Sequence, residues 1–292
     1  MNQPQVTLDD RTTMPQLGLG VFQVPPEDTE QVVAHGLAAG YRSIDNAARY
    51  GNEAGVGAAI AARGLARDEV FVTTKLANPD QGHASTLAAF DASVQKLGLD
   101  VVDLYLIHWP CPGRGETLNT WRAMEELRAA GRVRAIGVSN FLPHHLAELL
   151  EAAEVRPVVN QIEVHPYHQQ KELRAFNAEH GIVTEAYSPL GQGAVLADPV
   201  ITGIAERLGR TPAQVVVRWH LQLGNVVIPK SVTPSRMAEN LDVLGFELSE
   251  VDMAAIDGLD RGARIGFHPD LFNGYPEDFE EGSPARTGVA AG

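Results

Sequence analysis

The segment RSIDNAARYGNEAGVGAAIAARGLARDEVFVTTK, residues 42–75, contains one complete strand–helix–strand unit. Two short runs within it, Arg42–Asp45 and Val70–Lys75, have the length and apolar centres of buried strands. The alanine-rich stretch Gly55–Ala62 between them has the composition of a helix. Two consecutive strands joined through a helix run parallel, because a parallel pair needs a long crossover connection. The segment therefore predicts one parallel βαβ unit.

The same alternation continues along the chain and predicts eight strands. These are Leu17–Val21, Arg42–Asp45, Val70–Lys75, Val102–Ile107, Val133–Val138, Pro157–Gln161, Val183–Ala186 and Val226–Ile228. The helices expected between them include Thr29–Ala39, Gly55–Ala62, Ser85–Leu97, Thr117–Ala130, Pro143–Ala152, Glu172–His180, Pro199–Leu208 and Pro234–Leu244. Eight such units close a parallel barrel. An open doubly wound sheet is disfavoured, since no G-x-G-x-x-G follows the first strand. We expect a (β/α)₈ TIM barrel.

The two ends of the chain frame this barrel. Residues Val6–Met14 predict an N-terminal β-hairpin that closes the barrel bottom. After Leu259 the sequence is rich in glycine, proline and charge, yet its first half carries aromatic side chains. We therefore expect a C-terminal loop over the active-site face, followed by a disordered tail from about residue 283 to residue 292. No repeat or linker divides the chain, so we expect one domain over residues 1–292.

Composition limits the possible functions. The net charge of −14 argues against a nucleic-acid surface, which needs clustered cations. No apolar run approaches the length of a membrane-spanning helix, and the N-terminus has no signal-peptide pattern. The single cysteine, Cys111, excludes an intramolecular disulfide and fits a reducing compartment. We expect a cytoplasmic protein that binds neither nucleic acid nor membrane.

Polar residues stand at the ends of the predicted strands, where barrel enzymes place their chemistry. Asp45 ends the second strand, Tyr50 lies in the next loop, Lys75 ends the third strand and His108 follows the fourth. A tyrosine is a poor acid at neutral pH, but an adjacent ammonium makes its proton easier to release. Each residue alone is more often a capping or surface group. Their joint occurrence on three neighbouring strands predicts a site that protonates an oxygen.

The histidine pairs do not predict a metal site. His144 and His145 are adjacent, and His165 and His168 are separated by a proline-containing turn. Neither pair has the H-E-x-x-H pattern or the cysteine spacing typical of zinc sites. We expect no metal.

Seven motifs occur in order over residues 5–275 and resemble the aldo-keto reductase family. They are DNAARYGNE (45–53), TTKL (73–76), DLYLIHWP (103–110), GVSNF (137–141), NQIEVHPY (160–167), AYSPLGQG (186–193) and VIPKSVTPSRMAEN (227–240). The short loop after the fourth strand and the GFHPDLFNG segment look most like bacterial members of the 2,5-diketo-D-gluconate reductase type. The resemblance implies reduction of aldehydes and ketones by hydride transfer from NADPH.

The resemblance also implies residue roles. Tyr50 would be the general acid in a tetrad with Asp45, Lys75 and His108. The cofactor residues would be Ser139, Asn140 and Gln161 at the carboxamide, Tyr187 stacked on the nicotinamide, Ser188, Leu190 and Gln192 along the pyrophosphate, Lys230, Ser231, Val232, Thr233 and Arg236 at the 2′-phosphate, and Glu239 and Asn240 at the adenine. Two cations beside a helix N-terminus suit a phosphate site.

The departures from the family pattern concern the substrate. Ala77 stands where relatives commonly have tryptophan, and Arg49 replaces a side chain that is usually apolar. Phe22, Trp109 and Phe272 are the expected substrate walls. We expect Arg49 either to favour substrates that carry a carboxylate or simply to extend into solvent.

Two other functions fit parts of the pattern. A Schiff-base aldolase would use Lys75 as its nucleophile, but it gives the predicted phosphate site no task. An NADPH-binding regulatory or sensor protein would share the barrel without catalysis. Members of the family are often monomers, and we expect a monomer that acts on small carbonyl compounds.

Overall fold

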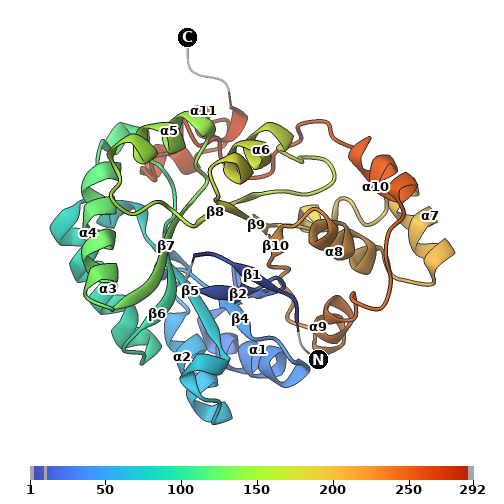
Figure 1. Cartoon of the computed structure of the whole chain (residues 1–292), viewed down its shortest axis with the longest axis horizontal. Coiled ribbons are helices and arrows are strands. Elements are labelled where there is room, and N and C mark those ends of the chain that lie inside the picture. Colours follow the sequence, from blue (N-terminus) through green and yellow to red (C-terminus); the bar gives the residue numbers. More distant parts are fainter. Residues whose placement is uncertain (1–2, 10–11, 289–292) are drawn as a thin grey trace.

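The fold is described from a computed structural model, which places residues 3–9 and 12–288. Eight parallel strands form one sheet in the order β10-β9-β8-β7-β6-β5-β4-β3. Their bounds are β3 Leu19–Gly20, β4 Ser43–Asp45, β5 Phe71–Leu76, β6 Val102–Ile107, β7 Val133–Ser139, β8 Val159–Glu163, β9 Val183–Tyr187 and β10 Val226–Val227. The helices form a ring around the strands (Figure 1).

The first and last strands meet and close the sheet into a barrel. The Gly18 backbone N–H donates to the Val227 carbonyl at 2.9 Å, and the Val227 N–H donates to the Gln16 carbonyl at 2.9 Å. A further parallel bridge joins Gly20 to Lys230. The (β/α)₈ barrel is confirmed, and closure leaves its sheet without an unpaired edge.

The helices follow the expected alternation closely. They are α1 Pro26–Ala39, α2 Glu53–Arg63, α3 His83–Leu97, α4 Thr117–Ala129, α5 Pro143–Ala152, α6 Lys171–Glu179, α7 Pro199–Leu208, α8 Pro212–Gln222, α9 Pro234–Leu241, α10 Glu250–Asp257 and α11 Pro284–Thr287. Buried apolar side chains of strands and helices form one large cluster between the two layers. No helix in the part of the chain that the structure places combines the length and apolar character that crossing a membrane requires.

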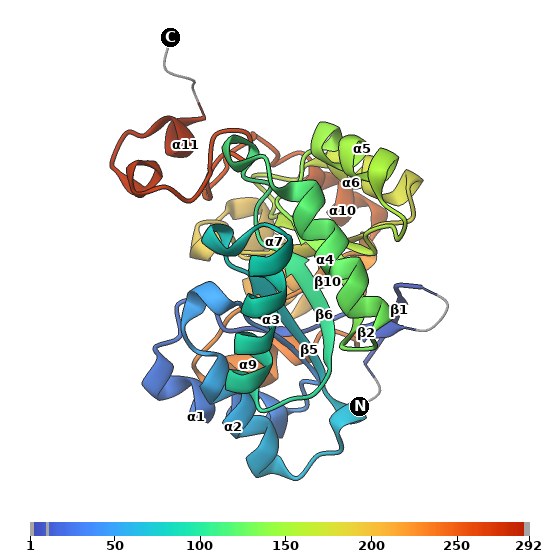
Figure 2. The same cartoon turned by 90° about the vertical axis from the view of Figure 1, so that its left-hand side faces the viewer.

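The N-terminal hairpin is present as predicted. Strands β1 (Gln5–Thr7) and β2 (Thr13–Pro15) pair antiparallel. Leu8 and Met14 pack in one buried cluster with inward-facing strand residues such as Leu104 and Leu106. This apolar plug fills the barrel at the hairpin end, and Figure 2 shows the hairpin opposite the C-terminal segment.

The C-terminal segment, residues 260–288, is fixed to the barrel by buried contacts. The buried carboxylate of Glu163, at the end of β8, accepts the backbone N–H groups of Ile265 and Gly266, each at 2.7 Å. Further along, Phe272 is 4% exposed and packs edge-on against Trp109 with ring centroids 4.7 Å apart. The segment thus covers the carboxyl-terminal face of the strands, as the sequence predicts.

The expectation of disorder from about residue 283 is wrong for residues 283–288. They include the short helix α11, whose Ala285 is 1% exposed in a cluster with Trp109 and Phe272. The Arg286 guanidinium lies over the Phe267 ring, 4.9 Å from its centroid. Composition misled here because long-range apolar burial offsets the entropy of ordering a glycine- and proline-rich chain. Residues 289–292 lie outside the described residues.

Candidate active site

Four polar side chains meet at the carboxyl ends of β4, β5 and β6. Lys75 is fully buried in β5, and its Nζ lies 2.7 Å from Asp45 Oδ1. The same Nζ donates to the Asn46 carbonyl at 3.0 Å and to the Tyr50 hydroxyl at 3.4 Å. The rings of Tyr50 and His108 meet edge-on, with centroids 5.8 Å apart. The barrel therefore brings together the four residues that the sequence singles out.

Burial and charge determine the protonation states in this group. Burial raises the pKa of Tyr50, while the charge and hydrogen bond of Lys75 oppose that rise. Burial acts to lower the pKa of Lys75, but the charge and hydrogen bond of Asp45, together with the charges of Tyr50 and Glu185, outweigh it, and the lysine pKa lies above its ordinary value. Burial, together with the charges of Lys75 and Arg49, holds the pKa of His108 well below its usual range. At neutral pH the site thus holds a protonated phenol, an ammonium and a neutral imidazole.

The pKa of Tyr50 is raised, whereas the sequence predicts a proton that is easily released. Lys75 acts in the expected direction, but loss of hydration is the larger effect. The physical reason is that burial disfavours the charged phenolate.

A second carboxyl group, which is not among the residues predicted from the sequence, lies behind the first. Gln161 Nε2 donates to Asp45 Oδ2 at 2.7 Å and to Glu185 Oε2 at 2.9 Å. Burial and the charge of Asp45 raise the pKa of Glu185 to about 8. Glu185 therefore holds its proton at neutral pH, and as a neutral group it does not compete with Asp45 for the Lys75 ammonium. The available signal was a glutamate inside the predicted apolar strand Val183–Ala186.

The residues expected at the carboxamide form one hydrogen-bonded group beside the tetrad. Tyr187 OH donates to Asn140 Oδ1 at 2.8 Å, and Asn140 Nδ2 donates to the His108 carbonyl at 3.0 Å. Ser139 Oγ donates to the Gln161 carbonyl at 2.8 Å. Gln161 differs from the expectation in one respect, because its amide nitrogen is already committed to two carboxyl groups.

The residues expected along the phosphates lie on two segments after β9 and β10. Ser188 and Gln192 have positive φ angles of 48° and 51°, in a turn that contains Leu190 and the short 3₁₀ helix Gly191–Gly193. Ser231 Oγ accepts the Thr233 backbone N–H at 3.1 Å.

The expected phosphate-binding cations, Lys230 and Arg236, lie just before α9 and in its first turn. Lys230 and Arg236 are exposed, and neither makes an ion pair with any residue that the structure places. Unpaired cations beside a helix N-terminus suit a phosphate. The flanking residues are Val232, which is 47% exposed, Glu239, whose Oε1 accepts Thr211 Oγ1 at 2.7 Å, and Asn240, which is 3% exposed.

One aromatic side chain contacts the Tyr50 ring, and four others, among them Trp109, the residue that follows His108, pack together. The Phe22 ring is 5.1 Å from the Tyr50 ring and 48% exposed. Trp109, next to His108, packs against Phe272, which in turn meets Phe279 edge-on at 5.5 Å. We call Phe22, Trp109, Phe267, Phe272 and Phe279 the aromatic rim. Three of its five members come from the C-terminal segment.

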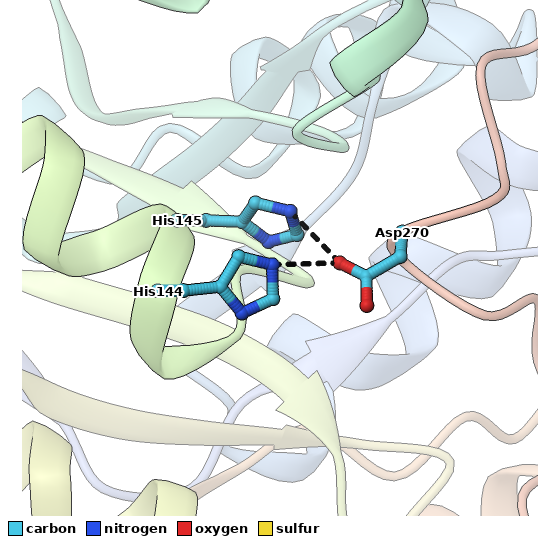
Figure 3. A group of neighbouring side chains, drawn as sticks. All are labelled: His144, His145 and Asp270. Atoms are coloured by element: carbon cyan, nitrogen blue, oxygen red, sulfur yellow. Dashed lines mark hydrogen bonds and ion pairs between the residues drawn. The ribbon is translucent and has the colours of Figure 1, made fainter.

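Among the described residues, one cluster outside this site has metal-ligand chemistry. Asp270 Oδ1 lies 2.8 Å from His144 Nε2 and 3.1 Å from His145 Nε2 (Figure 3). However, His145 Nδ1 accepts the Leu142 backbone N–H at 3.2 Å and caps α5, so a neutral His145 carries its proton on Nε2. A metal ion would need that Nε2 lone pair. The arrangement therefore fits a hydrogen-bonded clasp between α5 and the C-terminal segment, and the absence of a metal stays a prediction.

The fold and the site define a class of protein: a closed (β/α)₈ barrel with an acid–base group at the carboxyl ends of its strands. A model of the Aldo/keto reductase family matches residues 15–261. The chain belongs to the aldo/keto reductase family, and it is therefore an oxidoreductase.

Individual relatives agree with this assignment. The chain is 58% identical over 270 residues to an aldo-keto reductase of Mycolicibacterium smegmatis, covering 92% of this chain and 98% of that protein. A crystal structure of an aldo/keto reductase from Brucella melitensis has a TM-score of 0.87 and 52% identity, covering 89% and 99% of the two chains. A mutant of Gox0644, solved in complex with NADPH, has a TM-score of 0.90 and 50% identity, covering 93% and 99%.

Proposed function

We propose that the protein reduces aldehydes and ketones to alcohols with NADPH, and that Tyr50 is the general acid. The observation that carries the proposal is the hydrogen-bonded line Asp45–Lys75–Tyr50, in which a buried ammonium lies 3.4 Å from the phenol oxygen. When bound, the cofactor supplies the hydride to the carbonyl carbon. The proton for the carbonyl oxygen comes from the Tyr50 hydroxyl.

Each member of the tetrad contributes to that proton transfer. Lys75 stabilises the phenolate left behind, because an adjacent positive charge favours the ionised form. Asp45 holds Lys75 in place and keeps it charged. His108, neutral at working pH, donates a ring N–H to the carbonyl oxygen and orients it beside the phenol.

The residues present fit the cofactor. The exposed cations Lys230 and Arg236, which form no ion pair within the part of the chain that the structure places, suit a 2′-phosphate, which NADPH carries and NADH lacks. Backbone turns with positive φ at Ser188 and Gln192 suit a segment that follows the pyrophosphate. Ser139, Asn140 and Tyr187 would hold the nicotinamide end. The solved complex of the Gox0644 mutant with NADPH supports the same choice.

The aldolase alternative is disfavoured by the state of Lys75. Its Nζ donates to a carboxylate, a carbonyl and a phenol, and its raised pKa keeps it as an ammonium. A Schiff base needs a free amine lone pair. The sensor alternative does not explain why all four residues of the tetrad are present, because binding of NADPH alone does not require them. Action as a monomer in the cytoplasm, and membership of the 2,5-diketo-D-gluconate reductase type, belong to the proposal as well.

The test is loss of NADPH absorbance with glyceraldehyde, in wild type and in Tyr50→Phe. We expect Tyr50→Phe to lower kcat by at least about 100-fold, with NADPH affinity changed by less than about threefold. Tyr167→Phe is the matched control, since the Tyr167 hydroxyl bonds Asp198 and takes no part in the tetrad. A Tyr50→Phe enzyme that keeps more than about a tenth of wild-type kcat would overturn the assignment of the acid.

A further inference from the structure

Arg49 is a cation that has no counterion among the described residues, and it lies beside the proposed catalytic residues. It precedes Tyr50 in the 3₁₀ turn Ala48–Tyr50, and its side chain is exposed. Its guanidinium lies over the Phe279 ring, 5.1 Å from the centroid. Within residues 3–9 and 12–288, no carboxylate forms an ion pair with it.

The charges around the tetrad leave the positive charge of Arg49 uncompensated. Asp45 neutralises Lys75 through the 2.7 Å ion pair. Glu185 and His108 are both neutral at working pH, and the charge of Arg49 contributes to the lowered pKa of His108. These five side chains together carry one positive charge, in a chain whose net charge is −14, and the acidic side chains within residues 277–281, around Phe279, form no ion pair with Arg49 in the described part of the chain. Such a field concentrates an anionic ligand at the site against the field of the whole protein.

The contact with Phe279 orients Arg49 without occupying its donors. A guanidinium stacked on a ring still presents its in-plane N–H groups, and these match the two oxygens of a carboxylate. The aromatic rim beside it offers apolar contact to the rest of a substrate, with Phe22 and Phe279 still partly exposed.

We propose that the preferred substrates are aldehydes and ketones that also carry a carboxylate, which Arg49 binds while the carbonyl oxygen faces Tyr50 and His108. This inference rests on the proposed reductase function and names its substrate class. Of the two expectations for Arg49, the proposal adopts the substrate contact, and the experiment below tests it against simple extension into solvent.

The experiment compares each anion with its neutral methyl ester. The pairs are 4-carboxybenzaldehyde with methyl 4-formylbenzoate, and succinic semialdehyde with methyl 4-oxobutanoate. The readout is the acid-to-ester ratio of kcat/KM, which cancels general effects on catalysis. We expect Arg49→Leu to lower this ratio by about 5- to 20-fold in at least one pair, as for a partly exposed charge-assisted contact. Arg49→Lys should give an intermediate ratio, since it keeps the charge and loses the planar fork.

Two control variants separate charge from packing. Phe279→Leu removes the ring under the guanidinium and keeps the charge, so most of the acid preference should remain. Arg286→Leu removes an arginine that lies over Phe267 and does not contribute to the lowered pKa of His108, so its acid-to-ester ratio should equal that of wild type. Raising NaCl from about 0.02 M to about 0.5 M should reduce the ratio in wild type but not in Arg49→Leu.

The outcomes distinguish this inference from the proposed function. If the esters are reduced but the ratio is the same in wild type and Arg49→Leu for both pairs, the assignment of Arg49 is wrong and the reductase stands. An equal fall of the ratio in Phe279→Leu and Arg49→Leu would mean that packing, not charge, selects the acid. If no carbonyl compound is reduced at all, the proposed function itself fails.

Discussion

Glu185→Gln should change how the stability of this protein depends on pH. Glu185 is fully buried in β9, bonded to Gln161 Nε2 and close to Asp45. Its pKa rises from 4.5 to about 8 on folding, because burial and the Asp45 charge disfavour its ionised form. A carboxyl group with a raised pKa stabilises the fold least at high pH, since only the unfolded chain releases the proton below pH 8.

The magnitude follows from these two pKa values. Below pH 4.5 Glu185 is protonated in the folded and in the unfolded chain, so its ionisation does not affect the free energy of unfolding. Between pH 4.5 and pH 8 each pH unit removes up to about 1.4 kcal/mol from the free energy of unfolding. From about pH 5 to about pH 7 the loss from this one group is on the order of 2 to 3 kcal/mol. Glutamine cannot ionise, so the free energy of unfolding of Glu185→Gln should rise relative to wild type by about that amount over this range.

Urea unfolding followed by tryptophan fluorescence measures the difference, since Trp121 and Trp219 are almost fully buried. The comparison requires equal m-values in the two proteins. Glu163→Gln is the matched control, because hydrogen bonds from His165 and two backbone N–H groups outweigh burial and lower the pKa of Glu163. Above about pH 5, Glu163 is ionised in the folded and in the unfolded chain. Glu163→Gln should therefore be less stable than wild type by an amount that hardly changes with pH in this range. If the difference in free energy of unfolding between Glu185→Gln and wild type were also constant with pH, the raised pKa of Glu185 would be refuted.

Three further predictions concern the cofactor and the C-terminal segment. Arg236→Ala should weaken NADPH binding by about tenfold and NADH binding far less, as measured by fluorescence titration. Equal losses of affinity for the two cofactors would contradict a 2′-phosphate contact. Gly266→Ala places a methyl carbon 3.0 Å from Glu163 Oε2, and hydrogen exchange in the C-terminal segment should accelerate. Gly203→Ala, where the added carbon meets nothing within 4 Å, should leave that exchange unchanged. Asp270→Asn should weaken the clasp to α5 by at most about 1 kcal/mol and speed proteolysis there, since the group is partly exposed.

The barrel was predictable because its signals are local. The spacing of apolar residues, the length of each apolar segment and the residues that end helices together predict the bounds of each βα unit. The predicted strand Val102–Ile107 and the predicted helix Pro143–Ala152 agree with the structure at both ends. The first strand is shorter than predicted, Leu19–Gly20 instead of Leu17–Val21, because residues at its start pair with β10 only as an isolated bridge. The helix α10, Glu250–Asp257, is short and was not predicted.

The site was predictable only in part, for a physical reason. Residues at strand ends converge in any closed barrel, so the tetrad could be assembled from sequence position alone. The protonation states of these residues could not be predicted from the sequence, because they depend on how much hydration each group loses on burial. Glu185 shows the difference: a glutamate in a strand suggests an exposed face, yet closure of the barrel places it at 0% exposure beside another carboxylate.

The arrangement separates proton chemistry from substrate choice. Asp45, Lys75 and His108 sit on or directly after strands, and a closed hydrogen-bonded barrel holds them in place. The aromatic rim instead depends on the C-terminal segment, whose anchors are individual contacts such as Glu163 to Ile265. Loops fixed by few contacts tolerate sequence change more easily than barrel strands do. Substitutions in residues 260–288 should therefore alter which carbonyl compounds are reduced before they alter the rate of the proton step.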